Sequence, residues 1–433
     1  MITATLQQEL EGNTERLPGS AETAEWRAAE LASFASEGFP TTRQEGWRYT
    51  DLKPIAEGRF DFAPGKPDPA AVDRVRALLS EHRTLIGPRR LVFVDGHAHP
   101  ELSATPNHDG LEVASLTDRW DSFERRQLRR LGDTGHPLSR LNTVFTQHGA
   151  WIEVAAGASL DEALHLVFAG SGTSGFALHP RVVIELGRGA RLTVVQHFLD
   201  AGEPANWLNP VIQINQSADS TLAFYRLQEH GGRQSHTSLA FAELGARAAL
   251  EIGYVDLGGR LTRNDIDVRL LEAGASVGLF GVFLASGQHI DNHTRVDHVA
   301  PETRSDAAFR GIIGRAGRGV FNGQVVVHRD AQRVAAQQRN DNLLLSEQAE
   351  IDTKPELQIY ADDVKCSHGT TVGELDPEQL FYLRSRSIDV GTARTMLTLA
   401  FAESVLERIG LPALRERIVE RVAARLGAWE GLR

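Results

Sequence analysis

One cysteine and a neighbouring histidine are the pair of side chains best placed for chemistry in this 433-residue sequence. Cys366 is followed two residues later by His368, and the alternation of residue types around them predicts an extended strand over residues 360–368. Because side chains alternate between the two faces of a strand, we expect the thiol and the imidazole on one face, where they could bind the same ligand. An equally open interpretation makes Cys366 a small apolar side chain in a sheet core. A nucleophilic Cys–His pair is disfavoured because neighbours two apart on a strand point in parallel.

A second polar cluster lies in the run QHIDNHTRVDHVAPETRS. It contains His289, Asp291, His293, Asp297 and His298. Spacing permits the first three of these to share a strand face, which would suit a metal ion. The interpretation we favour is an exposed, hydrogen-bonded strand face.

His97 and His99 follow an apolar run, RRLVFVDGHAHPEL, that predicts a buried strand. Amidohydrolase barrels place an HxH metal pair after their first strand, but such a barrel needs repeated strand–helix units afterwards, and these do not follow. We therefore interpret the two histidines as a solvated surface turn. A metal-dependent hydrolase that uses His97, His99 and the His289 cluster remains the alternative function.

Composition and missing motifs exclude several classes of protein. A net charge of −11 argues against a nucleic-acid binder, and no apolar run reaches the length of a membrane span, so we expect a cytoplasmic protein. A single cysteine excludes an internal disulfide and an all-cysteine metal cage. The sequence contains no P-loop, no GxGxxG after a strand, no GxSxG and no HExxH.

Short alternating runs separated by small residues fill the chain from about residue 151 to about residue 372. Alanines in the intervening turns fall at a nearly constant spacing of 32, 28, 28 and 29 residues. They are Ala158, Ala190, Ala218, Ala246 and Ala275, and Ala349 carries the same turn. Such a period predicts a β-solenoid, in which each unit buries its apolar face by stacking on its neighbours; a jelly roll or sandwich is the alternative.

Helical patterns flank the predicted solenoid and divide the chain into residues 1–149, 150–380 and 381–433. Apolar spacing predicts helices over residues 21–36, 69–82, 123–131, 137–148, 389–409 and 413–429. The last of these should fold back on the solenoid through Leu414, Ile418, Val422 and Leu426, or else dock a partner. Between the first two, Trp47 and Tyr49 suggest an aromatic clip under a loop.

Three stretches near the carboxyl end form a specific pattern. They read HIDNHTRVDHVAPETRS, GVFNGQVVV and NDNLLLSEQAEIDTKPELQIYADDVKCSHGTTVGELDPEQLFYLRSRS. Together they resemble the common core of the SufB/SufD family of iron–sulfur cluster assembly scaffolds. The run WRYTDL at residues 47–52, the chain length and the single cysteine are similar to the SufD branch rather than to the cysteine-richer SufB branch, which is a further alternative.

The resemblance implies a mainly β protein, a right-handed parallel β-helix flanked by amino- and carboxy-terminal helical regions. It also implies a complex with SufB and two copies of the ATPase SufC. SufC would dock on the carboxy-terminal helices, here through Met396, Leu399, Phe401 and Val405. His368 would lie where the SufB and SufD β-helices meet and, with a SufB cysteine, take part in forming the nascent cluster; Cys366 is a weaker candidate.

The resemblance further implies a non-catalytic subunit. It would hold no stable cofactor alone, share a transient iron–sulfur cluster with SufB, and rely on ATP bound to SufC. A homodimer without partners is possible, and neither nucleic acid nor membrane is an expected partner. The family usually reads SRG where this chain has Ser385, Arg386 and Ser387, which suggests that residue 387 does not adopt a positive φ, since serine resists one.

Overall fold

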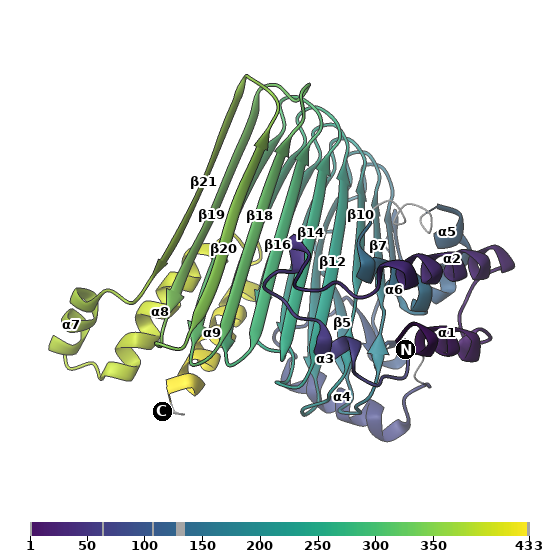
Figure 1. Ribbon diagram of the computed structural model, residues 1–433, viewed down its shortest axis with the longest axis horizontal. Helices are drawn as coiled ribbons and strands as arrows, with labels where there is room; N and C mark the ends of the chain where they lie inside the picture. The colour runs from purple at the N-terminus through teal and green to yellow at the C-terminus, as the bar shows by residue number, and fades with distance from the viewer. Residues whose placement is uncertain (1, 63–64, 106–107, 127–134, 431–433) are drawn as a thin grey trace.

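The computed structural model describes residues 2–62, 65–105, 108–126 and 135–430. These residues form an elongated stack of strands with helices at both ends (Figure 1). Within them the strands make one sheet of ten and one of eleven, and from β10 to β21 successive strands alternate between the two sheets. Neighbours inside each sheet are almost all parallel, as β14 is with β12 and β16. The chain is therefore a parallel β-solenoid, which confirms the expected fold class.

The strands are as follows. The ten-stranded sheet has the spatial order β2 (His97–Ala98), β1 (Arg90–Val94), β5 (Leu164–Gly170), β8 (Arg191–Asp200), β11 (Thr221–Glu229), β13 (Ala249–Asp256), β15 (Ser276–Ser286), β17 (Arg304–Gly314), β19 (Val334–Leu344) and β21 (Val364–Gly373). The other has the order β20 (Glu350–Ile359), β18 (Arg318–Val327), β16 (His289–His298), β14 (Leu261–Leu270), β12 (Ser235–Leu244), β10 (Val211–Gln216), β7 (Arg181–Leu186), β4 (Gly149–Val154) and β3 (Leu111–Ser115), with β6 (Ala177–Leu178) and β9 (Trp207–Leu208) beside it.

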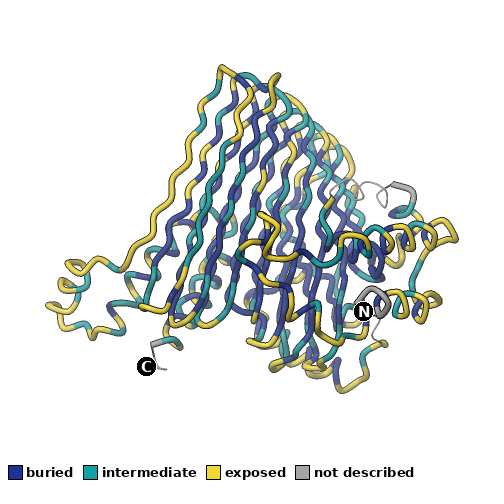
Figure 2. The backbone as a smooth tube through the Cα atoms, in the orientation of Figure 1, coloured by how far each residue is buried: buried dark blue, intermediate teal, exposed yellow. Residues whose placement is uncertain are grey.

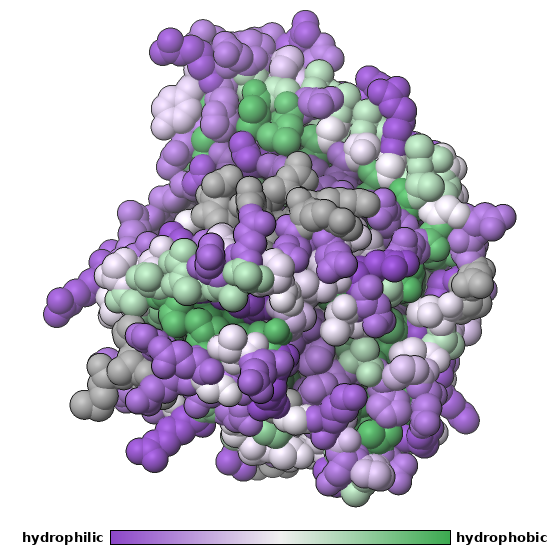
Figure 3. All heavy atoms as spheres, turned by 90° about the vertical axis from the view of Figure 1, so that its right-hand side faces the viewer, coloured by the Kyte–Doolittle hydropathy of each residue, from purple (hydrophilic) through white to green (hydrophobic). Residues whose placement is uncertain are grey.

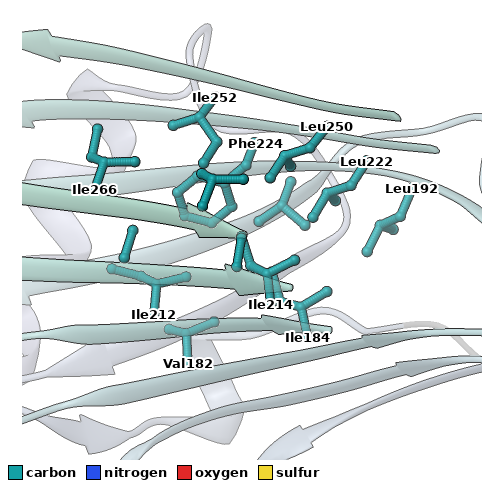
Figure 4. Close-up of a cluster of buried hydrophobic side chains, with 14 of the residues drawn as sticks. Val182, Ile184, Leu192, Ile212, Ile214, Leu222, Phe224, Leu250, Ile252 and Ile266 are labelled. Carbon is teal, nitrogen blue, oxygen red and sulfur yellow. The ribbon is translucent and has the colours of Figure 1, made fainter. Parts of the chain in front are cut away.

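Apolar side chains from the two sheets meet inside the solenoid. Ile212 and Ile214 of one sheet face Leu222, Phe224 and Ile252 of the other, and all are almost completely buried (Figure 4). Burying a side chain of this size stabilises the fold by roughly 1.5–3 kcal/mol. No single turn can close this core alone, so each turn depends on its neighbours.

The repeating turn differs in register from the predicted one. The small buried residue of each turn follows a residue of positive φ, and the series is Ala190, Ser220, Ala248 and Ala275 after Gly189, Asp219, Arg247 and Gly274. Ala218 and Ala246 therefore lie two residues too early. Ala349 leads into β20, in the other sheet, and does not belong to this column. The sequence did not reveal this register, because two of the left-handed positions hold aspartate and arginine instead of the glycine that usually marks them.

The helices and short 3₁₀ segments lie outside the two sheets. They are α1 (Ile2–Asn13), α2 (Ala21–Glu37), η1 (Glu45–Trp47), α3 (Lys53–Ala56), α4 (Pro69–Glu81), η2 (Pro100–Leu102), η3 (Thr117–Arg119), α5 (Trp120–Arg126), α6 (Pro137–Phe145), α7 (Pro377–Ser385), α8 (Val390–Leu406) and α9 (Pro412–Glu430). The predicted helices match α2, α4, α6, α8 and α9. The helix predicted over residues 123–131 overlaps α5, and its remainder from residue 127 lies outside the described residues.

The last helix folds back onto the solenoid. Leu414, Ile418, Val422 and Leu426 of α9 are buried in a cluster with outward-facing residues of the ten-stranded sheet, and α4 joins the same cluster. This confirms the fold-back interpretation rather than partner docking for that face of α9. At the other end, α1, α2 and α6 share a separate apolar cluster. The surface at that end is largely hydrophilic, with apolar residues in separate patches (Figure 3).

Ser387 ends α7 in a left-handed conformation. Its φ is 66°, its amide donates to the Arg384 carbonyl at 3.0 Å, and the Ile388 amide donates to the Leu383 carbonyl at 3.3 Å. This pair of hydrogen bonds is a Schellman motif, which places a left-handed residue just after the helix. The expectation that serine excludes a positive φ here is wrong, because the motif imposes the conformation regardless of the residue.

Residues 45–50, which we call the strap, run over the outer face of the eleven-stranded sheet. Trp47 is buried, and the Arg263 guanidinium on β14 lies 3.9 Å from the centre of its ring. Arg263 also donates to the Gly46 carbonyl at 2.8 Å. Glu45 pairs with Lys354 on β20 at 2.6 Å, so the strap reaches the last turn of the solenoid. The predicted aromatic clip is confirmed for Trp47.

Asp291 anchors the strap from below. It is fully buried, pairs with Arg263 at 2.8 Å and accepts a hydrogen bond from the Thr50 hydroxyl at 2.5 Å. Burial alone would raise the pKa of Asp291, but the charge of Arg263 and the hydrogen bonds from His293 and Thr50 outweigh burial and hold the pKa below its usual value. The carboxylate is therefore ionised in the folded protein at neutral pH and stabilises it.

We expect Asp291→Asn to lower the free energy of unfolding at pH 7 by about 3 kcal/mol, because Arg263 loses a buried partner. A carboxylate with a depressed pKa stabilises the fold above its unfolded pKa of about 3.9, and this contribution is lost as the pH falls. The difference in free energy of unfolding between the variant and the unmodified protein, measured with urea, should thus become smaller below about pH 4.

Asp219→Asn is the matched control, since Asp219 pairs with Arg247 on the surface. Exposed pairs contribute little to stability. A loss in the control as large as that in Asp291→Asn would show that burial of the strap anchor is not the cause.

Candidate functional site

Cys366 and His368 lie on β21, the last strand of the ten-stranded sheet. In register they stand beside Ala336 and Gln338 of β19, both of which are buried. The two side chains therefore occupy adjacent positions of the inward-facing row, above the solenoid interior. The shared face is confirmed, and the strand is confirmed from Val364 onward, four residues later than predicted.

Cys366 is partly buried and packs against the small apolar cluster that contains Val334 and Ala336. Burial raises the pKa of its thiol, and a hydrogen bond with the Ala336 backbone only partly offsets this. The thiol is therefore protonated at neutral pH, whereas metal binding and nucleophilic attack need the thiolate. The interpretation of Cys366 as a packed apolar residue is confirmed, at the open rim of the core, and its role as a ligand stays a prediction.

His368 is exposed and makes no hydrogen bond or ion pair with any residue that the structure describes. It stands over Gln338, whose side chain is 4% exposed and donates to the Gly323 carbonyl at 3.1 Å. Its imidazole is thus available to a ligand or to another chain. Of the pair, His368 is the better ligand at neutral pH.

The solenoid interior changes character beneath these residues. The largest apolar cluster ends at Phe309 and Phe321, whose ring centres lie 5.0 Å apart, and a smaller one around Val325, Val334 and Ala336 continues toward β20 and β21. Beyond them Thr353 donates to the Asn340 side chain at 2.8 Å and lies 3.1 Å from the Thr370 hydroxyl. The interior of the last turn is therefore mixed, with polar side chains at Asn340, Thr353 and Thr370 beside the small apolar cluster on which Cys366 packs. Sequence reasoning missed this switch, although the run QQRNDN at residues 337–342 signals it.

Both terminal strands are open on one side. Within the described residues β20 pairs only with β18, and β21 pairs only with β19. Most of β21 is exposed, as the strand at the far left of Figure 2 shows. Ile359, Tyr360 and Val372 add large apolar surface at this end, with exposed fractions of 40%, 63% and 48%. Open strand edges of this length are templates for pairing with another chain.

The His289 cluster does not form a metal site. Asp291 is committed to Arg263 and Thr50, while His289 lies 2.9 Å from the Thr50 hydroxyl and His293 lies 3.0 Å from Asp291. The favoured interpretation as a hydrogen-bonded strand face is correct in its bonding but wrong in its exposure, because the strap covers Asp291. Asp297 and His298 have separate partners, namely Arg295 and Thr303.

His97 and His99 also differ from expectation. Both are partly buried rather than solvated, and the ring centre of His97 lies 4.2 Å from that of His148, with the ring planes tilted by 48°. Among the described residues no three His, Cys, Asp or Glu side chains are grouped to hold a metal ion. His97 lies in the ten-stranded sheet and His289 in the eleven-stranded one. The geometry thus gives the metal-dependent hydrolase no site.

The residues expected to dock SufC differ in exposure, because one side of α8 packs against the sheet. Val405 is 4% exposed and packs against the sheet, and Leu399 and Phe401 are partly buried in the same cluster. Phe401 also lies under the Arg310 guanidinium at 4.4 Å. Only Met396 is largely open, at 46% exposure. Val405 therefore holds α8 on the solenoid and does not face a partner.

A set of exposed apolar residues lies beside Met396 in the chain. Phe381 and Tyr382 on α7 are 72% and 57% exposed, and Val390 at the start of α8 is 49% exposed. We call Phe381, Tyr382, Val390 and Met396 the α7–α8 patch. Helix α7 stands out at the far left of Figure 1, away from the sheets. The sequence analysis missed this patch, although two adjacent aromatics in a charged helical segment were a signal for it.

Cys366 and His368 share one strand face at an open rim, the neighbouring strand edge is unpaired within the described residues, and the α7–α8 patch is exposed. A four-ligand cluster needs at least two more donors than this rim supplies. The family model described as SUF system FeS cluster assembly, SufBD core domain, matches residues 168–401. The chain belongs to the SufBD family of iron–sulfur cluster assembly proteins.

Individual relatives agree with this assignment. The chain is 30% identical over 403 residues to the iron–sulfur cluster assembly protein SufD of Escherichia coli, covering 92% of this chain and 91% of that one. It is 29% identical to a SufBD family protein of Synechocystis, covering 92% and 89%. It is 22% identical to the SufD of Bacillus subtilis, covering 87% of each. No helix within the described residues is long and apolar enough to cross a membrane.

Proposed function

We propose that this chain is the SufD-type scaffold subunit of a SUF assembly complex that also contains SufB and two copies of SufC. It works in the cytoplasm and has no catalytic step of its own. The single observation that carries the proposal is the incomplete ligand pair, Cys366 and His368, at an unpaired edge of a family scaffold. SufB edge strands supply the missing pairing, and SufB thiols supply the missing ligands.

The chemistry of the pair assigns the roles. His368 is exposed and unbonded within the described residues, so it contributes an imidazole to iron or to the nascent cluster as that substrate forms between the subunits. Cys366 keeps its proton because burial raises its pKa, and it stays a secondary ligand. The cluster is transient because this chain alone has too few donors to retain it.

The α7–α8 patch is the proposed SufC contact. It replaces the earlier set of Met396, Leu399, Phe401 and Val405, of which only Met396 is largely exposed. Exposed aromatic residues are typical centres of binding energy in interfaces. ATP hydrolysis by SufC would then act on α7 and α8, which connect directly to the end of β21.

We expect His368→Ala to abolish or strongly reduce cluster formation by the reconstituted complex, while the complex still assembles, because an exposed side chain contributes little to folding. Cluster absorbance after anaerobic reconstitution measures the first effect, and co-purification measures the second. Ser367→Ala, on the opposite face of the same strand, is the matched control and should leave both unchanged. A His368→Ala variant that forms the cluster normally would remove His368 from the site.

We expect Phe381→Ala with Tyr382→Ala to weaken SufC binding by about tenfold or more, since truncating an aromatic anchor typically costs at least 2 kcal/mol. The binding affinity is measured by titrating SufC into the full chain. This test is sharper than truncation before residue 389, because removal of α9 would uncover the apolar outer face of the sheet.

Val405→Ala serves as the control for the α7–α8 patch. It should lower the thermal stability of the chain and leave SufC affinity nearly unchanged. Equal affinity for SufC in the Phe381 and Tyr382 double variant would place the docking surface elsewhere.

A further inference from the structure

A basic cavity of about 710 Å³ lies between α4, β1 and the start of α9. It is remote in the chain from β21, and none of the residues assigned above to cluster assembly or SufC docking lines it. Helix α4 lies at the bottom of the molecule in Figure 1, below the strands. The cavity is large enough for a small organic ligand, since such sites commonly span about 300–1,000 Å³.

Three arginines converge on this cavity. Arg76 lies on α4, Arg83 follows the helix, and Arg90 begins β1. Glu101 is the one carboxylate among the described lining residues, and it lies 3.7 Å from Arg76. Arg76 also lies 3.7 Å from Asp73, outside the lining, so two carboxylates offset its charge and the local excess of positive charge comes from Arg83 and Arg90.

Two of these arginines retain free donors. The Arg83 side chain is exposed and has no hydrogen bond or ion pair with any described residue. Arg90 donates from Nε to the Leu102 carbonyl at 2.9 Å, which fixes the direction of its guanidinium and leaves its two terminal amino groups without a partner among the described residues. An oriented guanidinium with open donors is suited to bind an oxyanion.

His165 supplies a buried donor at the same cavity. It is 7% exposed, and its Nδ1 lies 3.0 Å from Nε2 of His197, which is fully buried. Nδ1 of His197 has no partner among the described residues. A buried N–H without an acceptor is rarer than a vacant lone pair, so the His197 proton belongs on Nε2, where it is donated to His165.

This assignment places the His165 proton on Nε2. Burial, followed by the nearby charge of Arg90, lowers the pKa of His165 to about 4, so the ring is neutral at pH 7 and carries one N–H. Nε2 faces Gly87, where a Cβ would approach to 2.6 Å. The absence of a side chain at Gly87 therefore leaves this N–H accessible from the cavity wall.

The amino-terminal end of α9 completes the lining. Leu411, Ala413 and Leu414 border the cavity, and no acidic residue occupies the first turn of α9. Pro412, the first residue of α9, has no N–H, so the amides that follow it are the available donors. The amide groups of a first helical turn lack carbonyl partners and carry partial positive charge. In combination with oriented arginines, such a terminus favours a phosphate group.

We propose that this cavity binds a small molecule that bears a phosphate group, held by Arg83 and Arg90, with His165 Nε2 and the start of α9 as neutral donors. A phosphate fits better than a carboxylate because its oxygens point in several directions and the donors converge from three elements. The cavity volume exceeds that of free phosphate, which indicates a phosphate ester.

The test uses the full chain and pyrophosphate, titrated calorimetrically at low salt. Arg83→Gln and Arg90→Gln should each weaken pyrophosphate binding by about tenfold, because each removes a charge-assisted contact. Arg233→Gln is the matched control: it removes the same charge from an exposed residue outside the cavity. Thermal unfolding of each variant shows whether the fold is retained. Because Arg83 is exposed, Arg83→Gln should leave the unfolding temperature unchanged.

A second variant removes no charge. Gly87→Ala places a methyl group against His165 Nε2 and should also weaken pyrophosphate binding. The proposal would be overturned if pyrophosphate binding were undetectable. It would also be overturned if the Arg233→Gln control weakened binding as much as the cavity variants do. Tighter binding of malonate than of pyrophosphate, with the same dependence on Arg83 and Arg90, would overturn the phosphate assignment.

Discussion

Hydrogen bonding between stacked parallel strands is the interaction on which this molecule depends, because it joins the turns and aligns the apolar rows that form the core. A parallel stack has no internal way to end, since every strand offers donors and acceptors on both sides. At the amino-terminal end the antiparallel strands β2 and β3 flank the stack, and the helices α1, α2 and α6 pack nearby. At the carboxy-terminal end β20 and β21 remain open within the described residues. The long parallel strands β20 and β21 therefore offer more backbone for strand pairing than the short strands β2 and β3 at the other end.

The candidate site follows from that open end. Inward-facing side chains are buried in the earlier turns, but in the last turn no further strand covers them within the described residues. A histidine at such a position is therefore exposed, while the hydrogen bonds between β19 and β21 fix its backbone. Asn340, Thr353 and Thr370 give part of this rim a polar lining, beside the small apolar cluster that Cys366 joins. The strap adds rigidity, because Glu45 reaches Lys354 on β20 while Trp47 and Thr50 are anchored two or three strands away. The last turn is therefore held in place by the strap while its strand edges stay open.

Much of the architecture could be predicted because strand stacking leaves a strong periodic trace in the sequence. The period near thirty residues predicted the solenoid, and period-two alternation placed Cys366 and His368 on one face. The turn register was misplaced at Ala218 and Ala246, since the left-handed positions there hold Asp219 and Arg247 rather than glycine. Local pattern also cannot show that a distant segment covers a surface. The strap buries Asp291 from more than two hundred residues away, and that contact has no periodic signal.

The helical docking region shows the same limit. Amphipathic spacing identified α8 and α9, but it could not say which residues face the sheet and which face solvent, so Val405 and Met396 were grouped together although only Met396 is largely exposed. The sheet surface, formed by residues far away in the chain, decides between them. Cys366 presents a related case: its sequence context predicted a ligand and a core residue equally, and the structure shows that it packs on an apolar cluster at the rim.

Amide hydrogen exchange along β21 tests the central claim most directly. In the isolated chain the amides of β21 that point away from β19 should exchange fast, while those of β13 and β15 in the middle of the stack stay protected. In the complex with SufB, β20 and β21 should become protected and the middle strands should not change. Unchanged exchange at β21, with new protection at β2 and β3 instead, would contradict the account.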